Sequence, residues 1–396
     1  MNTQNNKFVH RTQHLPLACS GLALGISGFA SLLDTMLQKY WELEANNIWI
    51  ASSILIPIAL LLITLLSFKY IKHKKIMKFE IKEPLFSSFI PTYAMVIMCI
   101  SGYIAGWEKG DGWIAVNQVI GAIIMCTALL LQIVLLVFFI KHILAKHSWN
   151  LHPVYGSWFV PSVGMATATT FANRFNQAIL PDEFFQAFWY FSFAWYLILL
   201  IPITYSMLFK TKVSNDRLAS TAVYFAPANL TLAGFIQTFS VNKKALEIYG
   251  QSSSFIAGMS IFLWAFGVSM MIILLIFSIR ILFKSKFSFL FASLTFPISV
   301  GALGTTYMNL FLHQSSFASE SFVKIFWELT GILSIIFFIL VSLVLLYIVP
   351  TFLYKVGEIL FSKKYDYEHH HVYHETKQNV EVDENKLIVE DKELKS

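Results

Sequence analysis

Long uncharged apolar segments alternate with short polar ones along most of this chain. An apolar stretch of ~20 residues crosses the hydrocarbon core of a bilayer as a helix, which satisfies its own backbone hydrogen bonds there. The pattern therefore predicts ten transmembrane helices. They cover Leu15–Leu33, Ile48–Phe68, Leu85–Gly106, Trp113–Ile140, Tyr155–Asn173, Phe184–Phe209, Ala219–Phe239, Ser253–Ile279, Ser288–Leu312 and Ile325–Tyr354.

The composition supports this interpretation, because 56% of the residues are hydrophobic and only 13% are charged. Soluble domains carry about one quarter charged residues. We therefore predict an all-α integral membrane protein with a cytoplasmic N-terminus over residues 1–14, a membrane domain over 15–354 and a disordered polar tail over 355–396. The tail contains His369, His370, His371 and His374. These histidines are an alternative metal site, but no fixed geometry or cysteine accompanies them, so we expect no metal.

Basic residues predict the orientation of the helices. Short cytoplasmic loops retain Lys and Arg during insertion. The segment between the second and third predicted helices alone holds Lys69, Lys72, Lys74, Lys75, Lys78 and Lys82. We therefore expect both termini in the cytoplasm and the protein in the plasma membrane. Because this pattern also explains the basic balance of the chain, we expect no nucleic-acid partner.

Glycine and proline are concentrated in the odd-numbered segments, whereas the even-numbered ones are Leu/Ile/Phe-rich runs such as Leu129–Ile140. A proline inside a membrane helix frees a carbonyl that protein or a water-filled cavity must satisfy, and glycine leaves open space or permits close helix approach. The simplest arrangement is five tandem helical hairpins, with odd helices around a central pore and even helices outside. The alternative is that these residues serve only helix packing, as Gly21 and Gly25 would.

Individual residues of the odd segments are candidates for the pore. The predicted kinks are at Pro91, Pro161, Pro227 and Pro297. The predicted pore-lining residues are Gly25, Gly164, Thr167, Asn229, Gly301 and Thr305. No ionisable residue lies in the middle of any predicted span, although proton-driven carriers commonly place relays there. An uncharged path favours passive or weakly binding conduction.

Four short motifs, each on an odd segment, carry a family resemblance. They are Leu15-Pro-Leu-Ala-Cys-Ser-Gly-Leu-Ala-Leu-Gly25, Pro161-Ser-Val-Gly164, Ala226-Pro227-Ala228 and Leu294-Thr-Phe-Pro297. In this order they are similar to the tellurite-resistance/C4-dicarboxylate transporter family, which includes bacterial TehA-type proteins and plant slow anion channels. The resemblance covers roughly Leu15–Leu312, and the helix spacing continues to about Tyr354.

The resemblance implies a homotrimer in which five inner and five outer helices of each protomer form a separate pore. It also implies that a phenylalanine of the ninth helix occludes this pore, and the matching residue is Phe296. An aromatic ring in a narrow apolar pore excludes water and ions, so its movement can gate conduction. The residues alone give Phe296 no preference over Phe291.

The leading hypothesis is a channel-like permease for a small inorganic or dicarboxylate anion. The alternatives are a proton-coupled transporter of C4-dicarboxylates such as malate, or of sulfite or tellurite, and a membrane-embedded sensor that signals through its tail. No Ser/His/Asp, metal or nucleotide constellation is visible in the spans or loops. We therefore expect neither enzyme activity nor a cofactor.

Overall fold

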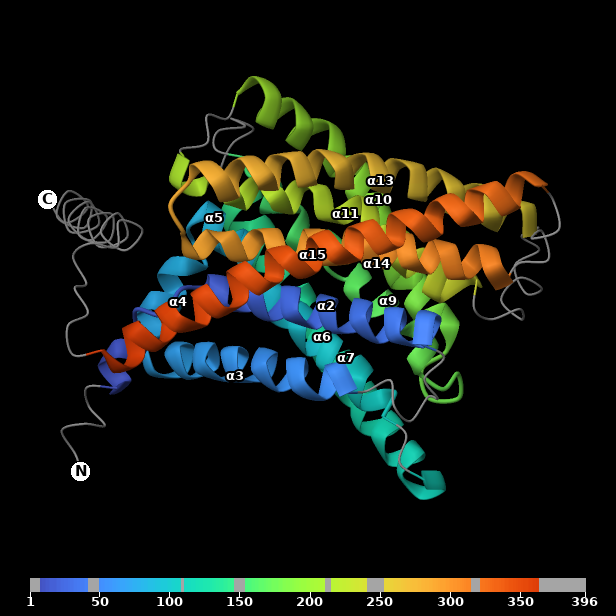
Figure 1. Cartoon of the computed structure of the whole chain (residues 1–396). Helices are drawn as coiled ribbons and strands as arrows, with labels where there is room; N and C mark the ends of the chain where they lie inside the picture. The colour runs from blue at the N-terminus through green and yellow to red at the C-terminus, as the bar shows by residue number, and fades with distance from the viewer. Residues whose placement is uncertain are drawn as a thin grey trace, which may run out of the picture.

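The computed structural model describes residues 8–41, 50–107, 110–145, 154–210, 215–240, 253–314 and 321–362. The regular structure within these ranges is helical (Figure 1). Nine helical stretches among the described residues are long and apolar enough to cross a membrane. The prediction of an all-α membrane protein is therefore confirmed. The predicted tail from residue 363 onward, with its histidines, lies outside the described residues.

The even-numbered predicted segments form long, regular outer helices. These are α3 (Ile50–Lys72), α7 (Gly110–Phe139), α10 (Asp182–Phe209), α13 (Ser253–Lys284) and α15 (Ser321–Phe361). Only 22 to 33% of the residues in their apolar windows are buried. Large aliphatic side chains such as Ile201 and Leu346 are exposed. Such surfaces suit lipid rather than water.

Four odd-numbered segments form the interior of the bundle, where 78 to 89% of the corresponding residues are buried. Their helices are α2 (Ala18–Trp41), α5 (Pro84–Phe89) with α6 (Thr92–Ala105), the 3-10 helix η5 (Asn215–Phe225) with α11 (Ala226–Phe235), and η7 (Phe289–Phe291) with α14 (Ala292–Gln314). The difference in glycine and proline content thus coincides with a difference in burial.

The fifth segment corrects the prediction of one continuous helix over Tyr155–Asn173. It is a series of short turns, namely η3 (Gly156–Phe159), α8 (Val160–Val163), α9 (Ala166–Thr169) and η4 (Ala172–Arg174). Pro161 cannot donate a backbone hydrogen bond. The side-chain amide of Gln132, on α7, instead donates to the carbonyls of Val160 and Pro161 at 2.9 and 3.1 Å. A neighbouring helix therefore supplies hydrogen bonds that the broken segment lacks.

The remaining prolines differ in their effect on the helices. Pro91 lies between α5 and α6, Pro227 lies in the first turn of α11, and Pro297 lies inside α14. The outer helices α3, α10 and α15 run continuously through Pro57, Pro202 and Pro350. A proline by itself therefore does not end a helix in this protein.

Several helices extend beyond their predicted ends, and the extension is longest in α2 and α15. The helix α15 continues to Phe361, past the predicted end at Tyr354. The helix α2 continues to Trp41 and so includes Asp34, whose side chain is buried. The expectation that the spans contain no inner ionisable residue is wrong at Asp34. A charge ends an apolar run in the sequence, but it does not end a helix whose backbone bonds are already satisfied.

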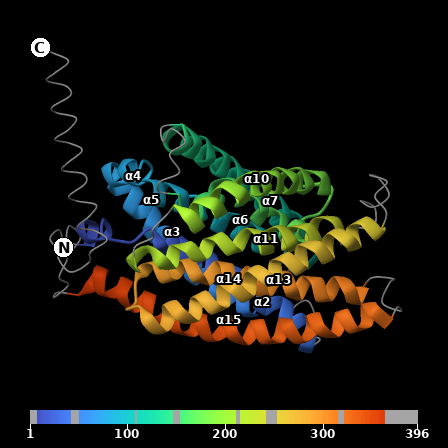
Figure 2. The same cartoon turned by 90° about the horizontal axis from the view of Figure 1, so that it is seen from above.

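The helix α2 packs against α3, α6 and α14, and α14 also packs against α11, α13 and α15. Figures 1 and 2 show α15 running along one side of the bundle beside α14, with α7 on the opposite side. The guanidinium of Arg11 donates to the carbonyl of Leu360 at 3.0 Å. The first and last described residues therefore lie at the same end of the bundle.

A buried ion pair joins the elements at this end. The ammonium of Lys69 lies 2.7 Å from a carboxylate oxygen of Glu80 and also donates to the carbonyl of Leu15 at 2.8 Å. The Tyr70 hydroxyl donates to the other oxygen of Glu80 at 2.7 Å. Lys69, which the sequence places among the loop cations, is therefore part of the packed structure and fixes the start of α2.

Candidate functional site

Two cavities lie among the inner segments. The first has an empty volume of about 450 Å³, which includes space open to its surroundings. It is lined by Gly21, Leu24, Phe89, Thr92, Met95, Phe159, Val160, Val163, Gly164, Val223, Ala226, Pro227, Leu230, Ala292, Ser293, Phe296 and Pro297. The second has an empty volume, measured in the same way, of about 280 Å³. It is lined by Gly28, Ser31, Cys99, Thr167, Thr170, Phe171, Leu230, Phe296, Val300 and Leu303.

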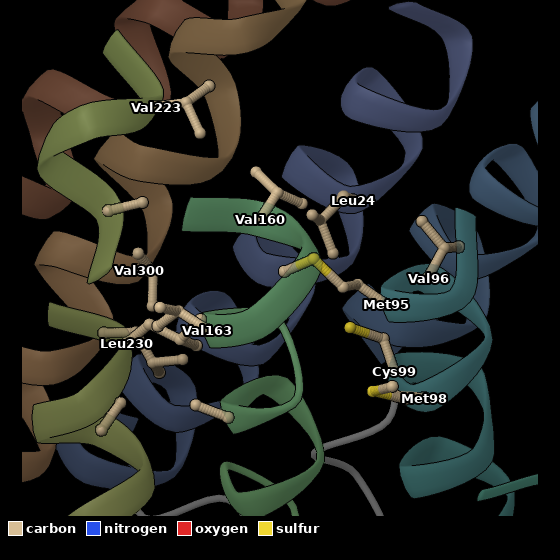
Figure 3. Packing of buried hydrophobic residues seen from close by; sticks show 14 of the residues in the cluster. Leu24, Met95, Val96, Met98, Cys99, Val160, Val163, Val223, Leu230 and Val300 are labelled. Carbon is tan, nitrogen blue, oxygen red and sulfur yellow. The ribbon is translucent and has the colours of Figure 1, made fainter. Parts of the chain in front are cut away.

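Every inner segment contributes to both cavities in the same order. Its earlier residues line the first cavity and its later residues line the second. The pairs are Leu24 and Ser31, Met95 and Cys99, Val163 and Thr167, Pro227 and Leu230, and Pro297 and Val300. The five segments therefore run in one direction around a common axis, with the second cavity further along it. In Figure 3, Leu24, Met95 and Val160 lie near one another, as do Val163, Leu230 and Val300.

Phe296 and Leu230 line both cavities and therefore separate them. The ring of Phe296 lies against Gly28, where an added Cβ would be 3.4 Å from Cδ2 of the ring. Phe296 is partly exposed within an otherwise buried helix, in keeping with its position beside empty space. Phe291, by contrast, is fully buried and packs against Phe287 with ring centroids 5.4 Å apart.

Both cavities are mostly apolar, and each has a few hydroxyl-bearing residues in its wall. These are Thr92 and Ser293 in the first, and Ser31, Thr167 and Thr170 in the second. Thr170 donates to the carbonyl of Thr167 at 2.8 Å, and Ser31 shares a hydrogen bond with the Tyr103 hydroxyl at 2.9 Å. The Thr167 hydroxyl is buried and has no hydrogen-bond partner among the described residues. Its oxygen has almost no accessible surface in this conformation, so the O–H group would donate to a molecule in the second cavity after a local movement exposes it.

Besides Phe296, four of the candidate residues from the sequence lie on these cavities. Gly164, Pro227 and Pro297 line the first, and Thr167 lines the second. Gly164 also permits close packing, because a Cβ there would lie 2.7 Å from the Gln132 amide nitrogen. These residues come from three different segments that the fold brings together around one axis.

The other candidates lie outside the linings of both cavities. Three of them are at contacts between helices, and Thr305 bonds within its own helix. Gly25 faces Thr295 of α14, and Gly301 faces Met271 of α13. The Asn229 amide donates to the carbonyl of Gly267 at 3.0 Å. Thr305 donates to the carbonyl of Gly301 at 3.2 Å. The kink candidates Pro91 and Pro161 lie where their segments break, outside the linings of both cavities.

Several residues near the cavities were not predicted from the sequence. Leu230 shares the constriction with Phe296, and Gln132 satisfies the broken fifth segment. The signal for Gln132 was available, because it is an amide inside the apolar run of α7. Such a residue needs an internal partner in a bilayer. Nothing in the sequence distinguishes Leu230 from the other leucines, because its role depends on its side chain facing the cavities.

Residues 14–354 match the model of the SLAC1 family, described as voltage-dependent anion channels. The chain belongs to this family. The match confirms the resemblance found in the sequence and covers the five inner segments, both cavities and the outer helices. This SLAC1 family member is therefore an anion channel or transporter. A comparison with curated proteins gave no match.

Proposed function

We propose that this SLAC1 family member is a channel-like permease for small anions and that its path runs through the two cavities. The observation that carries the proposal is the position of Phe296, whose ring, together with Leu230, separates two cavities on the same axis. The SLAC1 family supports an anion as the transported species. In this conformation the path is closed at Phe296.

The physical basis of the closure is dewetting. An anion must shed water to pass an apolar constriction, where no group replaces the lost hydrogen bonds. Phe296 and Leu230 offer only carbon surface at this point. A rotation of the Phe296 ring, or a shift of α14 away from Gly28, would join the cavities. The Thr167 hydroxyl would then donate to the anion on one side of the constriction.

The proposal includes a membrane setting. The charge bias of the loops supports a cytoplasmic position for both termini, and in this orientation the first cavity faces the cytoplasm and the second faces outward. The bond between Arg11 and Leu360 supports a common side for both ends. We place the protein in the plasma membrane as a homotrimer of separate pores. The native mass of the purified protein tests the trimer.

The test of the gate is Phe296→Ala in proteoliposomes that report chloride, nitrate, sulfite and malate flux. Removing the ring removes the apolar barrier without breaking any hydrogen bond. We expect anion flux to rise by about tenfold or more, which corresponds to a barrier lower by ~1.4 kcal/mol. The relative fluxes of the four anions identify the preferred substrate.

Phe291→Ala is the matched control, because Phe291 lies in the same segment but is fully buried away from the cavities. Its truncation leaves a cavity that costs about 3–5 kcal/mol in soluble cores. We expect lower thermal stability and unchanged flux per folded protein. Equal flux changes in both variants, or no gain for Phe296→Ala, would contradict the gate.

A second candidate function is proton-coupled anion transport, for example of a C4-dicarboxylate. Asp34 favours it, since a carboxylate buried in a membrane helix commonly marks a proton or ion pathway. An imposed pH gradient separates the two functions in the same vesicles. Uphill anion uptake driven by the gradient would support coupling, whereas flux that only follows the anion gradient supports the channel-like permease.

A further inference from the structure

A cation lies just beyond the second cavity. Arg174 ends the broken fifth segment, one turn after Phe171, which lines that cavity. The guanidinium carbon of Arg174 is 5.2 Å from the ring centroid of Phe171 and 4.7 Å from that of Tyr103. Both distances are in the range of cation–π contacts. Tyr103 in turn bonds to Ser31, another residue of the cavity wall.

The contacts of Arg174 bring it close to two other inner elements. Tyr103 lies on α6, one turn after Cys99, which lines the second cavity. The Tyr103 hydroxyl shares a hydrogen bond of 2.9 Å with Ser31 on α2, and Asp34 lies one turn further along that helix. Arg174 is therefore beside the axis of the cavities, near the turn of α2 that carries Asp34.

The backbone around Arg174 is held in place by an outer helix. The side-chain amide of Gln118, on α7, donates to the carbonyls of Arg174 and Ala105 at 2.7 and 2.8 Å. The oxygen of the same amide accepts from the backbone N–H of Asn176 at 2.8 Å. Arg174 itself is partly exposed. The cation is thus fixed by its surroundings yet reachable from solvent.

Asp34 supplies a negative charge near this cation. It is 2% exposed and accepts a hydrogen bond from the Ser52 hydroxyl. Its other oxygen, Oδ1, has no hydrogen-bond partner among the described residues. The positive charge of Arg174 attracts an anion toward the second cavity, and the negative charge of Asp34 reduces that attraction. Conduction requires binding that is favourable enough to admit an ion but weak enough to release it.

We propose that Arg174 is the binding residue of an anion site at the outer entrance of the second cavity, and that Asp34 is the counter-charge that keeps this site weak. The ligand class is a small inorganic anion such as chloride. Arg174 contributes charge and N–H donors, and the Thr167 hydroxyl is the next donor along the axis. The placement of this site on a transport path rests on the proposed function.

The test measures how chloride flux into proteoliposomes saturates, with gluconate replacing chloride at constant ionic strength. We expect Arg174→Gln to raise the half-saturating chloride concentration by roughly tenfold, the effect of a unit charge at ~10 Å through an effective dielectric constant of about 20. Arg174→Lys should raise it less, because the charge remains. Asp34→Asn should lower it, because the carboxylate no longer opposes the anion.

Lys39→Gln is the control for surface charge, since Lys39 lies at the end of α2 and bonds to the Tyr40 hydroxyl at 2.7 Å. It should leave half-saturation unchanged. Unchanged half-saturation for Arg174→Gln, an equal change for Lys39→Gln, or a change of the same sign for Asp34→Asn would overturn the site. The opposite signs for Arg174 and Asp34 separate a binding role from general damage to the fold.

A binding measurement keeps this test independent of transport. Chloride that binds the folded protein raises its melting temperature. We expect a chloride-dependent rise for the purified wild-type protein, a smaller rise for Arg174→Gln and a larger one for Asp34→Asn. If the wild-type protein showed no flux but the rises in melting temperature followed this order among the three proteins, the result would refute the proposed function and support the site. Absence of any chloride-dependent rise in the wild type would overturn the site.

Discussion

The lipid-facing surface of the outer helices and the interior of the bundle satisfy polar groups in different ways. Exposed hydroxyls of the outer helices bond within their own helix, as Thr64 does to Leu60 and Ser269 to Ala265. In the interior, several polar side chains reach other elements instead, as Ser101 of α6 does to Gly121 on α7 at 2.7 Å. A helix that satisfies itself can face lipid. A segment that relies on its neighbours can be broken, and only the inner segments enclose the two cavities.

Breaks beside a proline occur only in inner segments among the described residues, although not at every inner proline. Pro57, Pro202 and Pro350 lie inside continuous outer helices, and Pro297 lies inside the continuous inner helix α14. Pro161 lies in a broken inner segment, where Gln132 is available as a donor. The break of a helix inside a bilayer therefore needs a hydrogen-bond partner from another element as well as a proline.

The largest difference between the two groups is expected from matched glycine substitutions. A Cβ on Gly25 of α2 would collide with the Thr295 side chain and lie 3.0 Å from the backbone nitrogen of Phe296, whereas a Cβ on Gly258 of α13 would meet no atom within 4 Å. Gly25→Val should destabilise the protein by more than ~3 kcal/mol through overpacking. Gly258→Val should change stability by less than ~0.5 kcal/mol. Thermal unfolding of the purified variants measures both.

Equal losses of stability from Gly25→Val and Gly258→Val would contradict this difference between outer and inner helices. They would mean that the surface of α13 is packed as tightly as the interior. Such a result would point to a protein partner on the lipid-facing side of α13. A loss confined to Gly25→Val would instead show that contact between α2 and α14, and not glycine flexibility, sets the requirement for a small residue.

The second prediction concerns the amide that supports the broken segment. Gln132→Leu leaves the carbonyls of Val160 and Pro161 without this donor and should cost about 1–3 kcal/mol. Thr127→Val on the same helix is the control, because Thr127 is exposed and bonds only within α7, to the carbonyl of Ile123. We expect almost no change for Thr127→Val. If Gln132→Leu unfolded at the wild-type temperature, the segment would not depend on α7.

Much of this fold was predictable from the sequence, because the apolar runs follow directly from the bilayer thickness. The alternation of Gly and Pro also anticipated which segments are buried. The irregular fifth segment was not predictable in this way, since Gln132 and Pro161 meet only after α7 and the segment pack together. The length of α2 was underestimated because Asp34 interrupts the apolar run without ending the helix.

The candidate site was predictable only in part. The family resemblance pointed to Phe296, and the structure places this residue between the two cavities. Composition alone did not distinguish residues that line a cavity from those at helix contacts, since glycine and asparagine serve both purposes. Gly25 and Asn229 illustrate this, because the rotation of each helix about its axis decides whether these positions face a cavity or a neighbouring helix. Arg174 directly follows the predicted fifth span, Tyr155–Asn173, and its distance from the axis depends on the break in that segment, which the apolar pattern does not reveal.

The smallest predicted effect concerns a single hydroxyl of the second cavity. Thr167→Val preserves the shape of the side chain and removes an O–H group that has no partner among the described residues. If that group donates to a passing anion, its loss costs about 0.5–1.5 kcal/mol of binding, or a roughly two- to tenfold higher half-saturating chloride concentration. The measurement is best made in a Phe296→Ala background, where the constriction no longer limits flux. Thr169→Val is the control, because the Thr169 hydroxyl already donates to the carbonyl of Ala166 at 2.7 Å. A change in both variants would assign the effect to packing of the fifth segment, and a change in Thr167→Val alone would place an inner hydroxyl on the anion path.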